Sequence, residues 1–348
     1  QYHPTLDNDM WWGKGFTEWT NVGKAKPLFK GHYQPKIPAD LGYYDLRLPE
    51  VRETQAQMAR KAGIEGFCYY HYWFGNGKQE LELPFNEVLK LGKPDFPFCL
   101  CWANESWHAK FWNNKGGSRK KLLLEQKYLG KSDYIAHFNK LLPAFVDHRY
   151  ISVEGKPVFV IYRPLDFPDI SYFIELWNNL ALKNGLKGIY FIGQTPQKND
   201  INKIRSTGIN AVNLVRLWEW LEKRTLTIHI KDKIRSTIFN LPNVHQYKDM
   251  INSFVGEEDY QHNVIPTIIP NWDHTPRSGR NGYVLNNSTP YFFSQHVKSV
   301  LRTLDDKPED LKLLFLKSWN EWGEGNYMEP DLKYGHKYLD ELAVIINM

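Results

Sequence analysis

Residues 157–193 read PVFVIYRPLDFPDISYFIELWNNLALKNGLKGIYFIG. An apolar run at 157–162 is followed by an amphipathic stretch at 171–183, and a second apolar run covers 188–193. Apolar runs of this length predict buried strands, and the stretch between them has the periodicity of a helix. The segment therefore predicts a strand, a crossover helix and a second, parallel strand.

The same alternation runs along most of the chain. Apolar runs predict seven strands, at 66–70, 96–102, 157–162, 188–193, 208–213, 264–268 and 313–318. Helix-like stretches lie between and after them, at 49–62, 83–91, 132–145, 171–183, 289–304 and 334–346. Repeated strand–helix units predict an α/β fold, and their number favours a (β/α)8 TIM barrel with long loops after the strands.

A barrel of this type needs an eighth strand, and that strand should precede the first helix. Gln1, Tyr2 and His3 stand ahead of the first loop. We therefore expect them to be the tail of a truncated first strand, with a leader segment missing from this chain. The cellular compartment (periplasmic, secreted or cytoplasmic) stays open.

The domain organisation follows from length and from what the chain lacks. Its 348 residues contain no internal repeat, low-complexity tract or linker. Barrels run from about 200 to over 400 residues as one domain, so a single catalytic domain over residues 1–348 is expected. The first loop, about residues 3–46, and the segment 214–262 are unusually long, and such segments are often functional. Residues 214–262, helical in pattern around 230–239, are interpreted as a candidate inserted helical subdomain or lid.

Composition narrows the function classes. Aromatic residues make up 15% of the chain, and many stand beside Gly, Asn, Asp or Glu, which suits the binding of sugar rings. The formal charge of +5 is scattered, with its densest run at 119–121, so nucleic acid is not the expected partner. No stretch approaches the roughly 20 apolar residues of a membrane span. Three cysteines without metal-like spacing predict neither a disulfide framework nor a zinc site, and no cofactor or metal is expected.

The strongest candidate site follows the last predicted strand. Residues 318–325 read SWNEWGEG, with Glu321 and Glu324 separated by Trp322 and Gly323. In an α/β barrel the active site forms at the carboxyl ends of the strands. Two carboxyl groups are the pair that glycosidic cleavage requires, because one donates a proton while the other accepts one or supports positive charge. The alternative is that both are solvated loop residues, but the adjacent aromatic and amide residues favour catalysis.

Other predicted strand ends and the first loop carry aromatic, amide and acidic side chains in the same style. His71 is interpreted as a substrate contact, not a metal ligand, and Arg163 as pairing either with an acidic sugar or, more plainly, with an internal acid. The alternative is that these side chains only pack in the core or cap loops. The predicted substrate-binding residues are Trp12, Glu18, Trp19, Tyr70, His71, Trp73, Trp102, Asn104, Glu105, Trp107, Arg163, Trp272, Asp273, Asn320 and Tyr327. Glu329 and Asp331, just beyond the acid pair, are interpreted as candidate supports of its loop.

Five of these segments together resemble a known family. The chain is similar to the WbsX-like proteins, called glycosyltransferase WbsX or glycoside hydrolase family 99-like domain proteins. The resemblance rests on residues 8–22, 31–35, 66–73, 101–105 and 319–325. It extends distantly to the endo-α-mannosidases of glycoside hydrolase family 99, which have a (β/α)8 barrel and a similar acid-Trp-x-acid-Gly segment.

The resemblance implies roles for the two acids. Glu321 would be the base that deprotonates the sugar 2-hydroxyl, and Glu324 the acid/base at the leaving oxygen. The intermediate would be a 1,2-anhydro sugar, and the outcome net retention. That route implies an α-linked manno- or rhamno-configured polysaccharide or oligosaccharide, cleaved in endo mode, although linkage specificity is not carried over.

Two other function classes stay open at this point. One is a glycosyltransferase of surface polysaccharide synthesis, against which stands the absence of a doubly wound pattern with a Gly-rich phosphate turn. The other is a carbohydrate-binding protein without catalysis. The sequence decides neither the sugar nor the oligomeric state.

Overall fold

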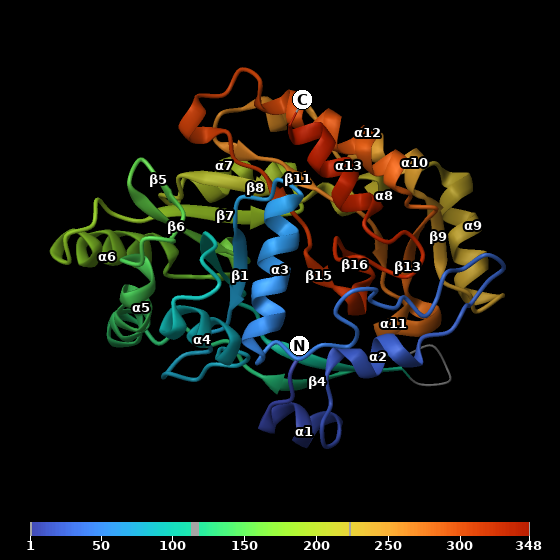
Figure 1. Ribbon diagram of the computed structural model, residues 1–348, viewed down its shortest axis with the longest axis horizontal. Helices are drawn as coiled ribbons and strands as arrows, with labels where there is room; N and C mark the ends of the chain where they lie inside the picture. The colour runs from blue at the N-terminus through green and yellow to red at the C-terminus, as the bar shows by residue number, and fades with distance from the viewer. Residues whose placement is uncertain (1, 113–117, 223, 348) are drawn as a thin grey trace. The chain divides into compact units, whose positions relative to one another are not determined.

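The computed structural model describes residues 2–112, 118–222 and 224–347 (Figure 1). The chain divides into two compact units. The sheet unit comprises residues 66–195 and 199–212, and the terminal unit comprises the rest of the described residues. Each is described by itself.

The sheet unit is built on parallel strands. β1 (Phe67–His71), β2 (Phe98–Trp102), β6 (Lys156–Ile161) and β7 (Tyr190–Thr195) lie in that order, and β8 (Ala211–Leu214) follows β7. Every residue of β2 is buried, as expected of a parallel strand covered on both faces. The helices of this unit are α4 (Leu83–Leu91), α5 (Lys131–Phe145), α6 (Ile170–Lys183) and α7 (Ile201–Arg205). The predicted strand–helix–strand segment is thus confirmed as β6, α6 and β7.

Two antiparallel additions were not predicted. β5 (Ser152–Val153) pairs with β6, and β3 (Trp107–Trp112) pairs with β4 (Ser118–Leu124) as a hairpin. Charged residues at 119–121 conceal the alternation expected of a strand. The core of the unit is aromatic, with Phe159, Phe173, Trp177 and Phe191 fully buried. Cys99 and Cys101 are buried, Cys68 is half-buried, and all three are free.

The terminal unit holds short strands and most of the helices. Its helices are α1 (Leu6–Trp12), α2 (Glu18–Lys24), α3 (Pro49–Lys61), α8 (Glu219–Glu222), α9 (Leu226–Thr237), α10 (Tyr247–Met250), α11 (Thr275–Ser278), α12 (Pro290–Leu301) and α13 (Lys337–Ile346). Its strands are β9 (Asn243–Gln246), β10 (Val264–Ile265), β11 (Thr267–Ile268), β12 (Trp272–Asp273), β13 (Tyr283–Asn286), β14 (Phe315–Leu316), β15 (Asn320–Glu321) and β16 (Asn326–Tyr327). β11 pairs with β14 in parallel, and β13 lies between β12 and β9.

Short 3-10 helices complete the chain. They are η1 (Pro164–Asp166), η2 (Lys198–Asp200), η3 (Arg216–Trp218), η4 (Ile251–Ser253), η5 (Glu257–Tyr260), η6 (Gly279–Asn281), η7 (Arg302–Leu304), η8 (Glu309–Leu311) and η9 (Trp322–Glu324). Within the terminal unit, α12 and α13 pack their apolar faces together through Phe293, Val297 and Leu342. A second cluster of Tyr2, Trp19, Tyr44, Trp322 and Tyr327 lies beneath the segment that carries the paired acids.

Three sequence predictions need correction. The predicted strand at 264–268 is split into β10 and β11 because Pro266 has no N–H to donate, and the predicted strand at 313–318 is reduced to β14. The predicted truncated first strand is unsupported: Tyr2 and His3 form no strand, although Leu46 N–H donates to the Tyr2 carbonyl at 3.1 Å. Gln1 lies outside the described residues. The first loop contains α1 and α2, which the sequence interpretation did not foresee.

The fold is therefore an α/β fold with a parallel central sheet. Closure of the sheet into a (β/α)8 barrel, the single catalytic domain and the lid role of 214–262 stay predictions. Residues 214–262 do contain α8, α9 and α10 besides β9. Over the described ranges, no helix combines the length and apolar character needed to cross a membrane.

Candidate active site

The segment that carries the paired acids folds back on itself. β15 pairs antiparallel with β16, so that Glu321 lies opposite Asn326. η9 connects the two strands and ends at Gly325, whose φ of 54° is a left-handed conformation that glycine adopts without strain. A Cβ at Gly325 would also lie 2.6 Å from the Lys36 Nζ. This tight turn places both glutamates at the same end of the hairpin.

One guanidinium group joins three carboxylates. Arg277, in α11, donates from Nη1 to Glu324 at 2.7 Å and from Nη2 to Glu321 at 2.9 Å. Its Nε and Nη2 also donate to the two carboxylate oxygens of Glu18 at 2.9 and 3.1 Å. Glu18 begins α2, so the first loop contributes to the cluster. The structure brings Glu18, Glu321 and Glu324 together, and we call these residues with Arg277 the carboxylate cluster.

Arg277 was missed by sequence reasoning, which assigned the acid-pairing role only to Arg163. It stands four residues after Asp273, in the stretch 274–282, which contains no Trp, Tyr or Phe. The available signal was electrostatic. Three partly buried acids need a cation nearby, and Arg277 is the arginine next along the chain from the predicted strand end at Trp272 and Asp273.

The cluster has more acids than cations, and its pKa values diverge. Burial raises the pKa of Glu321, as do the neighbouring Glu324 and Glu18 carboxylates, while Arg277 opposes them. Burial acts upward on Glu324 as well, but Arg277 and His274 outweigh it and hold its pKa at about 2. His274 Nε2 is 3.5 Å from the Glu324 carboxylate. Glu321 therefore binds a proton more readily than Glu324, which is ionised at neutral pH.

Gly323 permits the close approach of Glu18. A Cβ built on Gly323 would lie 2.6 Å from the Glu18 Cγ, far inside van der Waals contact. Glu18 is buried against this backbone and also accepts a hydrogen bond from the Asn21 side chain at 3.1 Å. Position 323 must therefore be glycine for the Glu18 side chain to lie where it does.

A buried layer supports the turn from below. Trp322 is fully buried, and its ring stacks on Tyr327 with centroids 3.7 Å apart. Its indole N–H donates to Glu329 at 2.6 Å, and Glu329 also accepts from Gln55 at 2.6 Å and from the Tyr44 hydroxyl at 2.8 Å. Burial raises the pKa of Glu329 to about 7. Glu329 thus contacts the turn residue Trp322 directly, in line with the predicted support of the loop.

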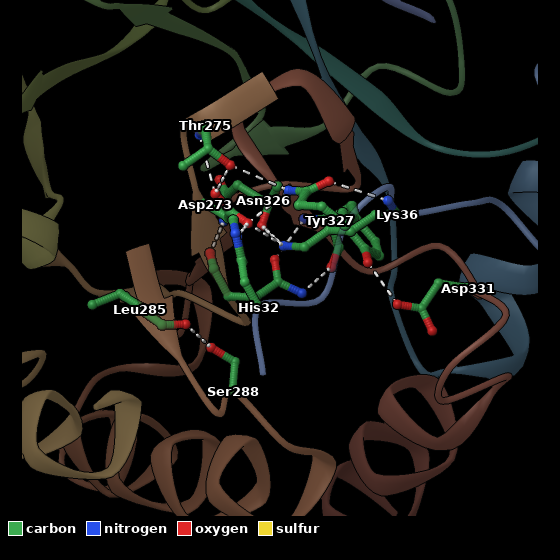
Figure 2. Close-up of polar contacts among 12 residues, drawn as sticks. His32, Lys36, Asp273, Thr275, Leu285, Ser288, Asn326, Tyr327 and Asp331 are labelled. Atoms are coloured by element: carbon green, nitrogen blue, oxygen red, sulfur yellow. Dashed lines mark hydrogen bonds and ion pairs between the residues drawn. The ribbon is translucent and has the colours of Figure 1, made fainter. Parts of the chain in front are cut away.

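A second network lies around Asp273 (Figure 2). One carboxylate oxygen accepts from His32 at 2.8 Å and from Gln34 at 2.6 Å, and the other accepts from the Thr275 hydroxyl at 2.6 Å. Lys36 donates to the Gly325 carbonyl at 3.3 Å and is 3.9 Å from Asp273. Although burial acts upward, Lys36 and His32 lower the pKa of Asp273 to about 2.

This network fixes two parts of the site at once. Asp273 holds the start of α11, which carries Arg277, and Lys36 holds the glycine that closes the acid turn. The cavity beside it measures about 50 Å³, which suits a water molecule or two and no sugar ring. Asp331 accepts from the Tyr327 hydroxyl at 2.6 Å at the edge of the same cavity. Asp273 therefore has a positioning role in this structure, and the predicted substrate contact stays a prediction.

The other predicted residues of the terminal unit differ in exposure. Trp12, in α1, is exposed, and Asn320 is half-buried and donates to the Tyr44 hydroxyl at 2.9 Å. Trp19, Trp272 and Tyr327 are buried in aromatic clusters, so their ring faces are covered by protein. Substrate contact by these residues stays a prediction.

In the sheet unit, several predicted residues pack around His137. His71 lies with its Nε2 at 2.8 Å from that of His137, and burial lowers the pKa of His71 to about 3. Trp73 stacks on His137 at 4.7 Å, and Trp102 meets it edge-on at 4.9 Å. A neutral, buried pair of histidines surrounded by tryptophans is typical of a core.

The remaining predicted residues of the sheet unit lie nearer solvent, apart from Asn104. Asn104 is buried; its side-chain amide N–H donates to the Arg163 carbonyl at 2.9 Å, and its amide oxygen accepts from the Arg163 N–H at 2.7 Å. Arg163 Nε is 3.5 Å from the Glu105 carboxylate, which is the internal pairing considered for it. Tyr70 is exposed at the end of β1, and Trp107 begins β3 and meets Tyr72 edge-on. Of these, Tyr70 presents the most accessible ring.

No metal site emerges from the part of the chain that the structure describes: it contains no group of three or more His, Cys, Asp or Glu side chains able to hold an ion.

Two solved structures have a similar fold. The structure of the family 99 endo-α-mannosidase from Bacteroides thetaiotaomicron in complex with Bis-Tris propane is similar at a TM-score of 0.58 and 16% identity, covering 90% of this chain and 87% of the other. A glycoside hydrolase-like protein is similar at a TM-score of 0.56 and 16% identity, covering 94% and 98%. At these identities the likeness shows the fold.

The sequence family is more specific. The family model described as glycosyltransferase WbsX matches residues 1–342, and the chain belongs to that family. The protein named uncharacterized protein WxcX, from Xanthomonas campestris pv. campestris strain B100, is 32% identical over 349 residues, covering 98% of this chain and 47% of its own length. WxcX of strain ATCC 33913 is equally similar. The chain spans about half the length of these curated relatives.

Proposed function

We propose that this chain is a retaining glycoside hydrolase with a (β/α)8 barrel, acting in endo mode on an α-linked manno- or rhamno-configured polysaccharide or oligosaccharide. The observation that carries the proposal is the carboxylate cluster, in which Glu321 and Glu324 share one guanidinium and have pKa values shifted in opposite directions. A pair of acids with divergent pKa values is what acid and base catalysis at one sugar requires. The fold shared with family 99 endo-α-mannosidases supports it.

The proposed reaction has two steps. Glu321 removes the proton of the sugar 2-hydroxyl, and the 2-oxygen attacks the anomeric carbon while Glu324 protonates the departing glycosidic oxygen. A 1,2-anhydro sugar forms. Water then attacks the anomeric carbon, giving its proton to Glu324, and the 2-oxygen recovers its proton from Glu321. Two inversions at one carbon give net retention.

The charge balance of the cluster fits a transition state with positive charge at the anomeric carbon. Three carboxyl groups face one guanidinium, so the four side chains together keep an excess of negative charge even when one carboxyl group is protonated. A developing oxocarbenium ion would supply the missing positive charge. Glu18 contributes to this field without a role in proton transfer.

The role assignment requires a change at Arg277. In this structure the pKa of Glu324 is lowered and that of Glu321 is raised, the reverse of the order that the proposed reaction needs at its start. A sugar oxygen that takes the Arg277 hydrogen bond from Glu324 would raise the pKa of Glu324 and allow it to act as the acid. If Glu324 remains ionised with substrate bound, the two roles exchange.

The test is turnover by paired variants. The wild type is first screened on α-mannans and rhamnose-containing polysaccharides with product analysis, and Glu324→Gln should then lower cleavage by about 10²–10⁴-fold. Glu321→Gln should be equally damaging, and a 2-deoxy substrate should not be cleaved. Glu309→Gln, at an exposed surface ion pair with Lys312, is the matched control. Unchanged turnover in the Glu324 variant would exclude the proposal.

A glycosyltransferase is the second candidate, because the family description names that activity. It predicts that a nucleotide sugar binds in a calorimetric titration and that no polysaccharide is cleaved. A carbohydrate-binding protein would instead bind oligosaccharides with an affinity indifferent to either glutamate substitution.

A further inference from the structure

Helix α9 carries a row of exposed apolar side chains. Leu226, Ile230, Ile234 and Ile238 follow one another at intervals of four residues, with exposed fractions of 82%, 55%, 40% and 71%. Phe239, directly after them, is 65% exposed. Residues four apart are neighbours on a helix surface, so Leu226, Ile230, Ile234 and the C-cap residue Ile238 form a continuous strip about 18 Å long at 1.5 Å per residue. An isolated exposed leucine is ordinary, but a strip of four large apolar residues is not.

The opposite face attaches the helix to its unit. Asp232 is buried, accepts from Arg224 Nη1 at 2.6 Å and lies 3.2 Å from His245 Nε2 in β9. Arg235 donates to the Pro242 carbonyl at 2.6 Å and lies over the Phe29 ring. Figure 1 shows α9 lying beside β9. Because the face with Asp232 and Arg235 is bound to the rest of the terminal unit, the apolar strip faces away from the protein.

The strip is bordered by cations. At 100° per residue, Lys231 and Lys233 fall on opposite sides of the apolar row, and both are exposed. The one acid of α9, Asp232, is buried and paired, so the exposed face carries positive charge without a carboxylate. An apolar row between lysines is the arrangement of helices that lie in the plane of an anionic membrane surface.

We propose that α9 docks this protein on an anionic phospholipid surface. The exposed row is convex, and a lipid surface accepts convex side chains without a complementary groove. Apolar side chains enter the boundary between headgroups and acyl chains, and Lys231 and Lys233 reach the phosphates with their ammonium groups. The proposal is independent of the proposed glycosidase activity.

The experiment is co-flotation of the whole chain with vesicles. The wild type should float with vesicles of equimolar phosphatidylglycerol and phosphatidylcholine, and binding should weaken as salt is raised. Ile230→Gln with Ile234→Gln should reduce binding about tenfold or more, because the two side chains lose their apolar burial. Lys231→Gln with Lys233→Gln should remove the preference over vesicles of phosphatidylcholine alone.

The matched control is Leu182→Gln, which removes an equally exposed apolar residue from α6 and should leave flotation unchanged. All four substituted positions on α9 are exposed, so the variants should unfold at the wild-type temperature. Wild-type protein that stays with the soluble fraction overturns the proposal, as does flotation that ignores all four substitutions. Self-association that disappears in the isoleucine variant, without flotation of the wild type, would assign the strip to a second copy of the chain.

Discussion

Two arginines of the terminal unit each hold three carboxylates, yet the two clusters differ in exposure and charge. Arg216 donates to Asp259 and Glu258 at 2.6 Å and to Glu219, and its side chain is 1% exposed. Arg277 donates to Glu18, Glu321 and Glu324, and its side chain is 29% exposed. An arginine with three carboxylates is thus shielded from solvent at Arg216 and partly exposed at Arg277.

The two clusters also differ in the number of other cations nearby, and therefore in net charge. Lys198 lies 3.4 Å from Glu258, and the charge of Lys307 acts on Asp259, so the cluster at Arg216 approaches neutrality. At Arg277, His274 lies 3.5 Å from Glu324 and the charge of Lys317 acts on the same carboxylate, so that three carboxylates face two permanent cations. A closed and balanced cluster fixes a fold, whereas an open cluster with excess negative charge can exchange a hydrogen bond with a ligand. Exposure and charge balance, not composition, separate a structural arginine from a candidate catalytic one.

The largest expected effect tests this comparison directly. Arg216→Met should lower the free energy of unfolding by about 3–5 kcal/mol, because it leaves buried carboxylates without their partner. Arg277→Met should cost less stability, since Glu321, Glu324 and the Arg277 side chain itself are partly exposed and only Glu18 is buried, but should abolish polysaccharide cleavage. Urea denaturation and product assays on both variants measure this. Equal stability losses, with cleavage retained by the Arg277 variant, would contradict the distinction.

A smaller effect should come from Gly323→Ala. The added methyl displaces Glu18 from the turn, and with it the two-point contact to Arg277, so cleavage should fall by about 10–100-fold. Stability should fall by about 1–3 kcal/mol from overpacking. Gly23→Ala in α2 is the control, because its Cβ would be an ordinary 3.7 Å from the Tyr43 hydroxyl. Wild-type cleavage by the Gly323 variant would show that Glu18 is dispensable.

The smallest effect concerns Glu329, a buried acid whose hydrogen-bond donors are the neutral side chains of Trp322, Gln55 and Tyr44. Burial raises the pKa of Glu329 to about 7 in the folded state, whereas Glu324, beside Arg277, is at about 2. A raised pKa means that the folded protein binds the proton more tightly than the unfolded chain. Stability from Glu329 is therefore complete below its unfolded pKa of roughly 4.3 and declines as pH rises toward 7.

Glu329→Gln should remove that decline, which thermal unfolding from pH 4 to pH 8 would show as a flatter dependence of Tm on pH. The substitution Glu341→Gln, in α13, serves as a control for the loss of one negative charge. A pH dependence identical to that of the wild type would mean that Glu329 is ionised throughout.

Local pattern was enough to predict the regular elements. α4 begins and ends where the pattern at 83–91 placed it, and β6, α6 and β7 confirm the segment at 157–193 within a few residues. The pattern failed where a single residue overrides it. Pro266 divided one strand, and the charged run at 119–121 concealed β4. It also failed in the first loop, where α1 and α2 are only seven residues long.

For the site, the sequence by itself determined which acids to consider, because Glu321, Glu324 and Glu18 stand in aromatic and glycine-rich segments next to predicted strand ends or in the long first loop. Only the tertiary structure decided which cation they share. Arg277 lies 259 positions from Glu18 and 44 from Glu321, and sequence spacing carries no information on contacts at that separation. The pKa values were likewise decided by the folded chain, since burial and a guanidinium at 2.7–2.9 Å exist only once distant segments have met.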